Sequence, residues 1–254
     1  MERPCYLQGG PGFRVALDGP ALSVARPGKA RTLYPLRRIS RVVASGEVEW
    51  STRALLACAE RGITVTFLTR DGALRGCLVG QGGERQELLA RLRDLLDRPD
   101  WRERYEDWRR GMASRARLAL GRRLGLAPGA VTLGELVVGL RGELVARAGS
   151  GVAGFLERRL TGLTRALVLE QLSRAGLDAR QLQALAGRVD LVGDLAGLVV
   201  LDLLLPLLRW LEGREAGGRI TDREVVELFE GRGERLEGLV RTLIARLHGW
   251  LAEV

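Results

Sequence analysis

Two patterns of hydrophobic and polar positions divide the chain near residue 80. Before that point, apolar residues alternate with polar or small ones in short runs, which is typical of β-strands. From residue 84 onward, leucine recurs at three- and four-residue spacing, which predicts amphipathic helices. We therefore predict an α+β fold, with a small N-terminal β domain that contains one helix, hinged to a larger all-helical C-terminal domain. Strands are predicted at 13–17, 21–25, 31–35, 39–44, 63–68 and 73–79, and the helix at 52–61.

Local signals set the limits of these elements. Asp18-Gly19 predicts a hairpin turn, and Pro27-Gly28 predicts a second turn. Ser51 is a suitable N-cap for the helix of the β domain, and Gly62 is a suitable residue just beyond its C-terminus. In the helical part, Thr221-Asp-Arg-Glu224 has the pattern of a capping box.

A flexible joint, Gln81-Gly82-Gly83, lies between the two patterns. The predicted domains are therefore 1–80, a β-rich dimerisation domain, and 84–254, the helical domain, with 81–83 as the hinge. The longest apolar stretch, Leu195 to Leu211, contains Asp202 and Pro206 and is shorter than the ~20 residues of a membrane span. It predicts a buried helix. No secretory signal is recognisable in residues 1–10, so we expect a cytoplasmic protein with no membrane partner.

The balance of charge changes this picture by suggesting a partner. The 254 residues contain 40 Lys and Arg against 31 Asp and Glu, a net charge of +9. Residues 1–80 have 12 basic and 6 acidic side chains, residues 81–130 have 12 and 8, and residues 131–254 have 16 and 17. The excess lies in the first 130 residues, which favours a polyanion such as duplex DNA as partner. The alternative is that arginine replaces lysine on solvated faces, because Lys29 is the single lysine.

Scarce residue types exclude several kinds of site. His248 is the single histidine, so sites that need two histidines, such as HExxH zinc sites, are excluded. We interpret His248, near Trp250, as a surface or packing residue. Cys5, Cys58 and Cys77 are too few for a disulfide framework or a cysteine-rich zinc site, and we expect them to be small core residues.

Arginine pairs and one aromatic series are the candidates for contact with nucleic acid. Arg37-Arg38, Arg109-Arg110 and Arg122-Arg123 could contact phosphates, or they are ordinary solvated charge. Trp101, Tyr105 and Trp108 follow i, i+4, i+7 spacing. They could stack on bases, but this spacing favours the packing of one helix face.

Several segments together resemble a known family. In the β domain these are Val15-Ala-Leu-Asp-Gly19, Ser45 to Ser51, and Leu55 to Leu68, which contains the pattern L-x-x-x-A-x-x-G-I-x-V-x-F-L. In the helical part they are Gly139-Leu-Arg-Gly142, the Ala-Gly-Leu-Asp that ends at Asp178, and Leu201 to Arg209. The sequence resembles the CRISPR-associated endonuclease/integrase family Cas one (Cas1), which inserts new spacers into CRISPR arrays. The resemblance implies a homodimer formed through the β domains, double-stranded DNA as ligand, and a Cas2-like protein or an active paralogue as partner.

The resemblance also implies a metal site whose ligands are missing here. The family holds Mg²⁺ or Mn²⁺ with a Glu, a His and a second acidic residue, and these positions fall on Arg141, Leu185 and Leu205. No metal or other cofactor is therefore expected, and of these motifs only the relic Asp202 remains. Arg141 could bind phosphate or pair with Asp202. For Asp202 itself, a structural acid bonded to an arginine is favoured over a remnant of the site.

Three hypotheses about function follow from the resemblance. The first is a catalytically inactive DNA-binding protein with a structural or scaffolding role in CRISPR adaptation. The second is an active metal-dependent DNA endonuclease/integrase whose ligands are displaced to Glu143, Asp190, Asp194 or Asp202. The third is a protein-interaction module that keeps only the fold.

Overall fold

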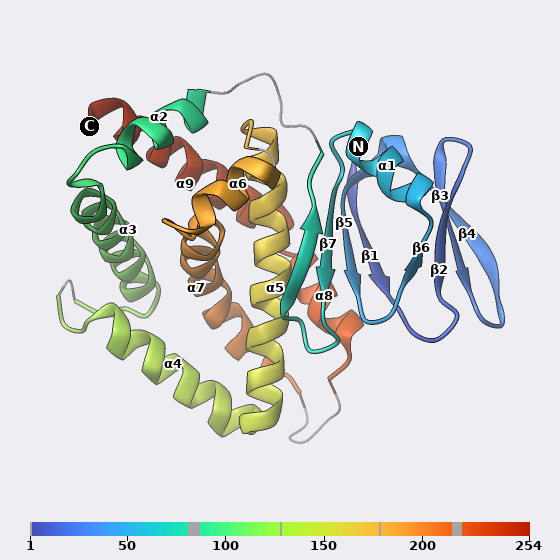
Figure 1. Cartoon of the computed structure of the whole chain (residues 1–254). Coiled ribbons are helices and arrows are strands. Elements are labelled where there is room, and N and C mark those ends of the chain that lie inside the picture. Colours follow the sequence, from blue (N-terminus) through green and yellow to red (C-terminus); the bar gives the residue numbers. More distant parts are fainter. Residues whose placement is uncertain (1, 81–86, 128, 178, 215–219) are drawn as a thin grey trace. The chain divides into compact units, whose positions relative to one another are not determined.

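The structure is a computed structural model that describes residues 2–80, 87–127, 129–177, 179–214 and 220–254 (Figure 1). It divides into two compact units: unit 1 is Met1–Leu89 with Arg165–Val192, and unit 2 is Ala90–Thr164 with Gly193–Val254. Strands fill the N-terminal part and helices follow, which confirms the predicted α+β class. The predicted hinge at 81–83 lies outside the described residues.

Unit 1 is built on two four-stranded sheets (Figure 1). The first has the order β1-β5-β7-β8, where β1, β5 and β7 are parallel and β8 is antiparallel to β7. The second has the order β4-β3-β2-β6, with β2, β3 and β4 antiparallel and the short β6 parallel to β2. The strands are β1 (Arg3–Gln8), β2 (Arg14–Asp18), β3 (Ala21–Arg26), β4 (Lys29–Pro35), β5 (Ile39–Ser45), β6 (Glu49–Trp50), β7 (Thr64–Leu68) and β8 (Leu74–Leu78).

One of the two predicted turns is displaced by a residue. Asp18 pairs with Ala21, so the central residues of the β2–β3 turn are Gly19 and Pro20 rather than Asp18 and Gly19. Gly19 has a φ of 53°, whereas a proline ring holds φ negative, so only the first central position is left-handed. The prediction at Pro27-Gly28 is correct, because Arg26 pairs with Lys29 across these two residues.

The helix of the β domain packs into the core of unit 1. Helix α1 (Thr52–Glu60) buries Ala54, Ala57 and Cys58 in a cluster with strand residues such as Val42 and Val65. The Ser51 side chain accepts a hydrogen bond from the Ala54 N–H, as predicted for an N-cap. Gly62 has a φ of 68°, which is the left-handed conformation expected at its position.

A buried ion pair joins β5 to a helix that is distant in the sequence. Helix α5 (Ser150–Arg174) contributes its residues from Arg165 onward to unit 1, and α6 (Ala179–Ala186) belongs to the same unit. Arg41 donates a hydrogen bond of 2.7 Å to Glu170, and both side chains are at most 3% exposed. Arg41 also donates to the Tyr6 hydroxyl at 3.3 Å, and Arg174 binds Glu170 at 2.9 Å. Neither Arg41 nor Glu170 stands out in the sequence.

Unit 2 is helical. Its elements are the larger part of α2 (Glu87–Leu96), α3 (Trp101–Arg123), α4 (Leu133–Ala148), the first part of α5, α7 (Leu191–Glu212), α8 (Asp222–Glu230) and α9 (Gly233–Glu253). The predicted capping box from Thr221 to Glu224 is present at the start of α8. A second one, from Thr132 to Glu135, begins α4. In both, the threonine hydroxyl accepts from the Glu N–H and the carboxylate accepts from the Thr N–H.

Helix α7 contains the long apolar stretch. Within the described residues, its length and composition are sufficient for a membrane span, and 56% of its most apolar window is buried in the protein. Residues 203 to 208 are all buried, including the helix-internal Pro206. This agrees with the prediction of a buried helix. The expectation that the segment is too short for a membrane span is wrong, because the helix extends beyond the apolar stretch to 22 residues.

Candidate functional site

The first position of the resembled metal site is occupied by an ion pair. Arg141 lies on α4 and is exposed, and its Nε donates a hydrogen bond of 2.9 Å to Glu157 of α5. Of the two alternatives for Arg141, the pairing with Asp202 is therefore wrong. The cause is tertiary, because Glu157 reaches Arg141 from a neighbouring helix and Asp202 is bound by other arginines.

The other two positions are apolar and buried. Leu185 lies on α6 and is 4% exposed, and Leu205 lies on α7 and is 7% exposed. Each side chain belongs to the packed interior of its own unit. A guanidinium and two alkyl side chains offer no lone pair to a cation, so these residues do not fit Mg²⁺ or Mn²⁺.

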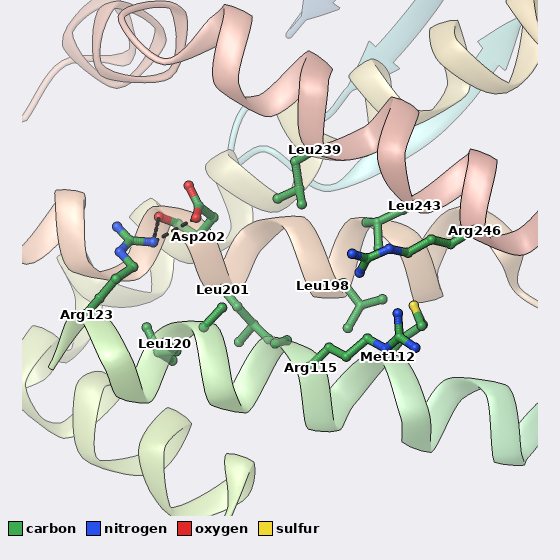
Figure 2. Close-up of a pocket in the computed structure, with 12 residues that line it drawn as sticks. Met112, Arg115, Leu120, Arg123, Leu198, Leu201, Asp202, Leu239, Leu243 and Arg246 are labelled. Carbon is green, nitrogen blue, oxygen red and sulfur yellow. Dashed lines mark hydrogen bonds and ion pairs between the residues drawn. The ribbon is translucent and has the colours of Figure 1, made fainter. Parts of the chain in front are cut away.

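Asp202 is bound on both carboxylate oxygens. Arg123 at the end of α3 donates to Oδ1 at 2.7 Å (Figure 2). Arg235 of α9 donates to Oδ2 at 2.7 Å and to Oδ1 at 2.6 Å. Burial alone would raise the pKa of Asp202. The hydrogen bond from Arg235 and the charge of Arg123 outweigh it, and they hold the pKa of Asp202 below its usual value. Asp202 is thus bonded to arginines, as the favoured interpretation expects.

The carboxylates considered as displaced ligands are bound to arginines at separate places. Glu143 accepts from Arg147 at 3.4 Å on the same helix. Asp190 lies 3.9 Å from Arg165 in unit 1. Asp194 lies 3.0 Å from Arg109 and accepts from the Tyr105 hydroxyl at 2.9 Å. In the part of the chain that the structure describes, no three His, Cys, Asp or Glu side chains gather closely enough to hold a metal ion.

The seven arginines predicted to contact nucleic acid fall into two groups. Those of the first group are bound to a carboxylate, and those of the second form no ion pair with a described residue. Arg109 binds Glu106 at 2.7 Å in addition to Asp194, and Arg110 binds Asp107 one turn away. Arg123 and Arg141 are bound as described above. The remaining three are exposed and form no ion pair with a described residue: Arg37, Arg38 and Arg122. A guanidinium already held by a carboxylate must lose that partner or share its charge before it neutralises a phosphate, so the second group is the stronger set of candidates.

Two further basic side chains are exposed without an ion-pair partner among the described residues, and neither was predicted to contact nucleic acid. Lys29 and Arg31 are exposed on β4, the edge strand that leads directly into the 3₁₀ turn η1 (Leu36–Arg38). Neither forms an ion pair with a residue in the described ranges. Their spacing of two, which places both side chains on one side of a strand, was the available signal. We call Lys29, Arg31, Arg37 and Arg38 the basic edge.

The aromatic series packs within unit 2. Tyr105 and Trp108 are 4% and 5% exposed, and their rings stack with centroids 5.6 Å apart. Trp108 also packs against Trp250 of α9 at 5.9 Å. These two rings are therefore closed to nucleobases, and the packing interpretation is confirmed for them. The half-buried Trp101 carries the Arg102 guanidinium 5.3 Å from its ring centroid.

The remaining rare residues have simple environments. Cys5 and Cys58 are buried, as predicted for core residues, and burial raises the pKa of the Cys5 thiol to about 12 and of Cys58 to about 11. The prediction is wrong for Cys77, which is exposed because its side chain lies on the outward face of β8, where exposed and half-buried residues alternate. His248 is half-buried, and its backbone carbonyl accepts from Arg91 at 3.4 Å.

Comparisons with known proteins agree with the resemblance. Residues 7–105 match the family model of the CRISPR associated protein Cas1. A CAS1 protein from Thermotoga maritima is similar in structure, with a TM-score of 0.74 and 14% identity over 98% of this chain and 97% of that one. A casposase bound to integration product has a TM-score of 0.69 and 13% identity, over 100% and 92% of the two chains.

The structure of TtCas1 in a complex with DNA is also similar, with a TM-score of 0.65 and 18% identity over 97% and 91% of the two chains. At these identities, the likeness shows that the fold is shared. No curated protein matches the sequence.

Proposed function

Because the family-model match and the shared fold support membership of the Cas1 family, we propose that this protein binds double-stranded DNA as a structural component of CRISPR adaptation. In this role it would hold DNA or a partner in place and would not carry out metal-dependent cleavage or strand transfer. The positive charge of the first 130 residues supplies the attraction to the phosphates.

One observation carries the inactive assignment. The three positions that the family uses for its metal hold an arginine bound to Glu157 and two buried leucines. The neighbouring acid, Asp202, forms ion pairs with Arg123 and Arg235. To bind a divalent cation, Asp202 would have to release two guanidinium groups, and it would find no second ligand at position 205.

The basic edge supports the DNA-binding part of the proposal. Its four side chains lie on an edge strand and the following turn, exposed and without ion pairs to described residues. Cations in this state release counterions from DNA when they bind, which gives affinity without sequence preference. The similar structures of a casposase bound to integration product and of TtCas1 with DNA make duplex DNA the natural first ligand to test.

The experiment combines binding and activity on one preparation of the full-length protein. We expect it to bind a fluorescent duplex with an affinity that falls steeply as salt increases, and to leave supercoiled and branched DNA unchanged in Mg²⁺ or Mn²⁺. Cleavage or strand transfer that depends on the metal and disappears when one of Glu143, Asp190, Asp194 or Asp202 is replaced would overturn the inactive assignment. A lack of salt-sensitive binding to duplex DNA at low ionic strength would instead favour a protein-interaction module.

We also infer a homodimer formed through the β-rich region. Strand β8 ends its sheet and therefore carries backbone N–H and C=O groups available for pairing with a second copy. Sedimentation velocity at micromolar concentration tests this inference, with the mass of two chains expected. A Cas2-like protein or an active paralogue is the further partner to test by co-purification.

A further inference from the structure

A cavity in unit 2 has a composition that DNA binding does not explain. It lies between α3, α7 and α9, and its volume is about 130 Å³ (Figure 2). Its walls are mostly apolar, formed by Met112, Leu120, Leu198, Leu201, Leu239 and Leu243. Ala116 and Ala119 line the same side as Met112, so α3 is thin at this point and leaves the space open.

The cavity matches the size of one large apolar side chain. An engineered protein cavity of about 150 Å³ binds benzene, which is the ring of a phenylalanine side chain. Leu198, Leu201 and Leu239 are only half-buried, so apolar surface of all three remains accessible beside the cavity. A side chain that entered would remove this surface from water, and that transfer is favourable.

The charges around the cavity differ at its two ends. At one end, Arg123 is paired with Asp202, which also binds Arg235 (Figure 2). Toward the other end, Arg115 of α3 and Arg246 of α9 line the cavity from facing helices. Both are exposed, and neither forms an ion pair with any residue that the structure describes. An apolar cavity with two available guanidinium groups beside it is complementary to an apolar group flanked by anions.

We propose that this cavity binds an acidic segment of a partner protein. A leucine- or phenylalanine-sized side chain of the segment enters between the helices, and neighbouring Asp or Glu carboxylates bind Arg115 and Arg246. This binding mode concentrates the affinity in one buried anchor and a few charge-assisted hydrogen bonds. The site goes beyond the proposed DNA binding and does not depend on it.

The lining favours a peptide over a nucleotide. Single-stranded nucleic acids are usually held by aromatic side chains on which bases stack, and the described residues of this lining include no aromatic one. The polar groups present are arginines and the already bound Asp202, so little remains to accept hydrogen bonds from the edge of a base. A duplex would contact the arginines but leave the apolar cavity unused.

The test measures binding of a defined peptide to the full-length protein. The probe is a fluorescein-labelled heptapeptide with one central phenylalanine between six Asp and Glu residues, followed by fluorescence anisotropy at low salt. We expect saturable binding with a dissociation constant below about 1 mM. Replacing the phenylalanine by serine should weaken binding about tenfold or more, because the anchor is lost.

Two variants separate the anchor from the charges. Ala116→Leu places a larger side chain in the cavity, and the double variant Arg115→Ala/Arg246→Ala removes the available cations; each should weaken binding of the phenylalanine peptide about tenfold or more. Arg241→Ala is the matched control, since Arg241 is exposed on the same helix α9 and does not line the cavity. It should leave the affinity within about twofold.

Three results would overturn the proposal. The first is equal affinity for the phenylalanine and serine peptides. The second is unchanged binding in both the filled and the double-arginine variants. The third is a thymidine oligonucleotide that binds more tightly than the peptide and is displaced by Ala116→Leu, which would assign the cavity to single-stranded DNA. Thermal unfolding verifies that each variant is folded, and duplex binding in the same preparations separates failure here from failure of the proposed function.

Discussion

The arginines of the two units are used in different ways. On the basic edge of unit 1, Arg31, Arg37 and Arg38 are exposed and have no ion-pair partner among the described residues. In unit 2, most of the arginines that sequence analysis selected are held by carboxylates of neighbouring turns or helices, as Arg123 is by Asp202. A third use occurs inside unit 1, where Arg41 is buried with Glu170.

The number of basic residues in a region therefore does not give the number of positive charges that can bind a ligand there. A paired arginine fixes the positions of helices, whereas an unpaired one remains free to neutralise phosphate. A buried one is costly to remove, because its partner would remain charged and desolvated. Each use predicts a different response to substitution.

The largest effect is expected at the buried pair. Arg41→Leu leaves Glu170 buried with only Arg174 beside it, and we expect the free energy of unfolding to fall by about 3–5 kcal/mol. Urea denaturation followed by circular dichroism measures this change. The exposed Arg38→Leu is the matched control and should stay within about 0.5 kcal/mol of the parent. Equal stability of the two variants would show that the buried pair is not special.

The second-largest effect is expected at Asp202. Asp202→Asn removes the charge that holds Arg123 and Arg235, and we expect a loss of about 1–2 kcal/mol at neutral pH, since Arg235 is partly exposed. The folded-state pKa of Asp202 is lowered, so its contribution is fully present above about pH 4 and is lost as pH falls through the folded pKa. Unfolding measured from pH 7 to acid should therefore show the two proteins converging in acid. A difference that grows in acid would contradict this assignment.

The third-largest effect is expected from a comparison of unpaired arginines with paired ones in duplex binding. Arg37→Ala/Arg38→Ala should reduce the slope of log K against log salt for duplex binding by about 1.8, which is about 0.9 for each phosphate that the variant no longer neutralises. Arg109→Ala/Arg110→Ala removes the same charge from a helix where both residues are paired, and it should change the slope by much less. Equal slopes for the two double variants would remove the distinction between the units.

The smallest effect is expected at Arg122, which is compared with its neighbour Arg123 on α3. Arg122→Ala should lower the salt slope by at most about 0.9 and leave stability within about 0.5 kcal/mol, because Arg122 is exposed and unpaired within the described part of the chain. Arg123→Ala should do the reverse, with a loss of stability and a nearly unchanged slope, because Arg123 binds Asp202. Salt titrations and urea curves on both variants give the result, and a shared response would contradict the pairing argument.

The amino-acid sequence was sufficient to predict the class of the fold, and its resemblance to the Cas1 family predicts that the metal ligands are missing. The patterns of apolar and polar residues identified β2, β3, β4, β5, β7 and β8 and the helical region, because side-chain direction follows directly from these periods. The resembled motifs located Arg141, Leu185 and Leu205, whose side chains cannot bind a cation in any arrangement. Strands β1 and β6 were missed, since each is defined by hydrogen bonds to a partner far away in the sequence.

The ion-pair partners of the arginines depend on how the chain folds. The partners of Arg41, Arg123 and Arg141 lie 129, 79 and 16 residues away, beyond the reach of a local pattern. The sequence indicated that the arginines outnumber the acids, and packing then determined which ones remain available to a ligand. The cavity beside Arg115 and Arg246 likewise depends on three helices meeting at the small residues of α3, a volume that exists only once the chain is folded.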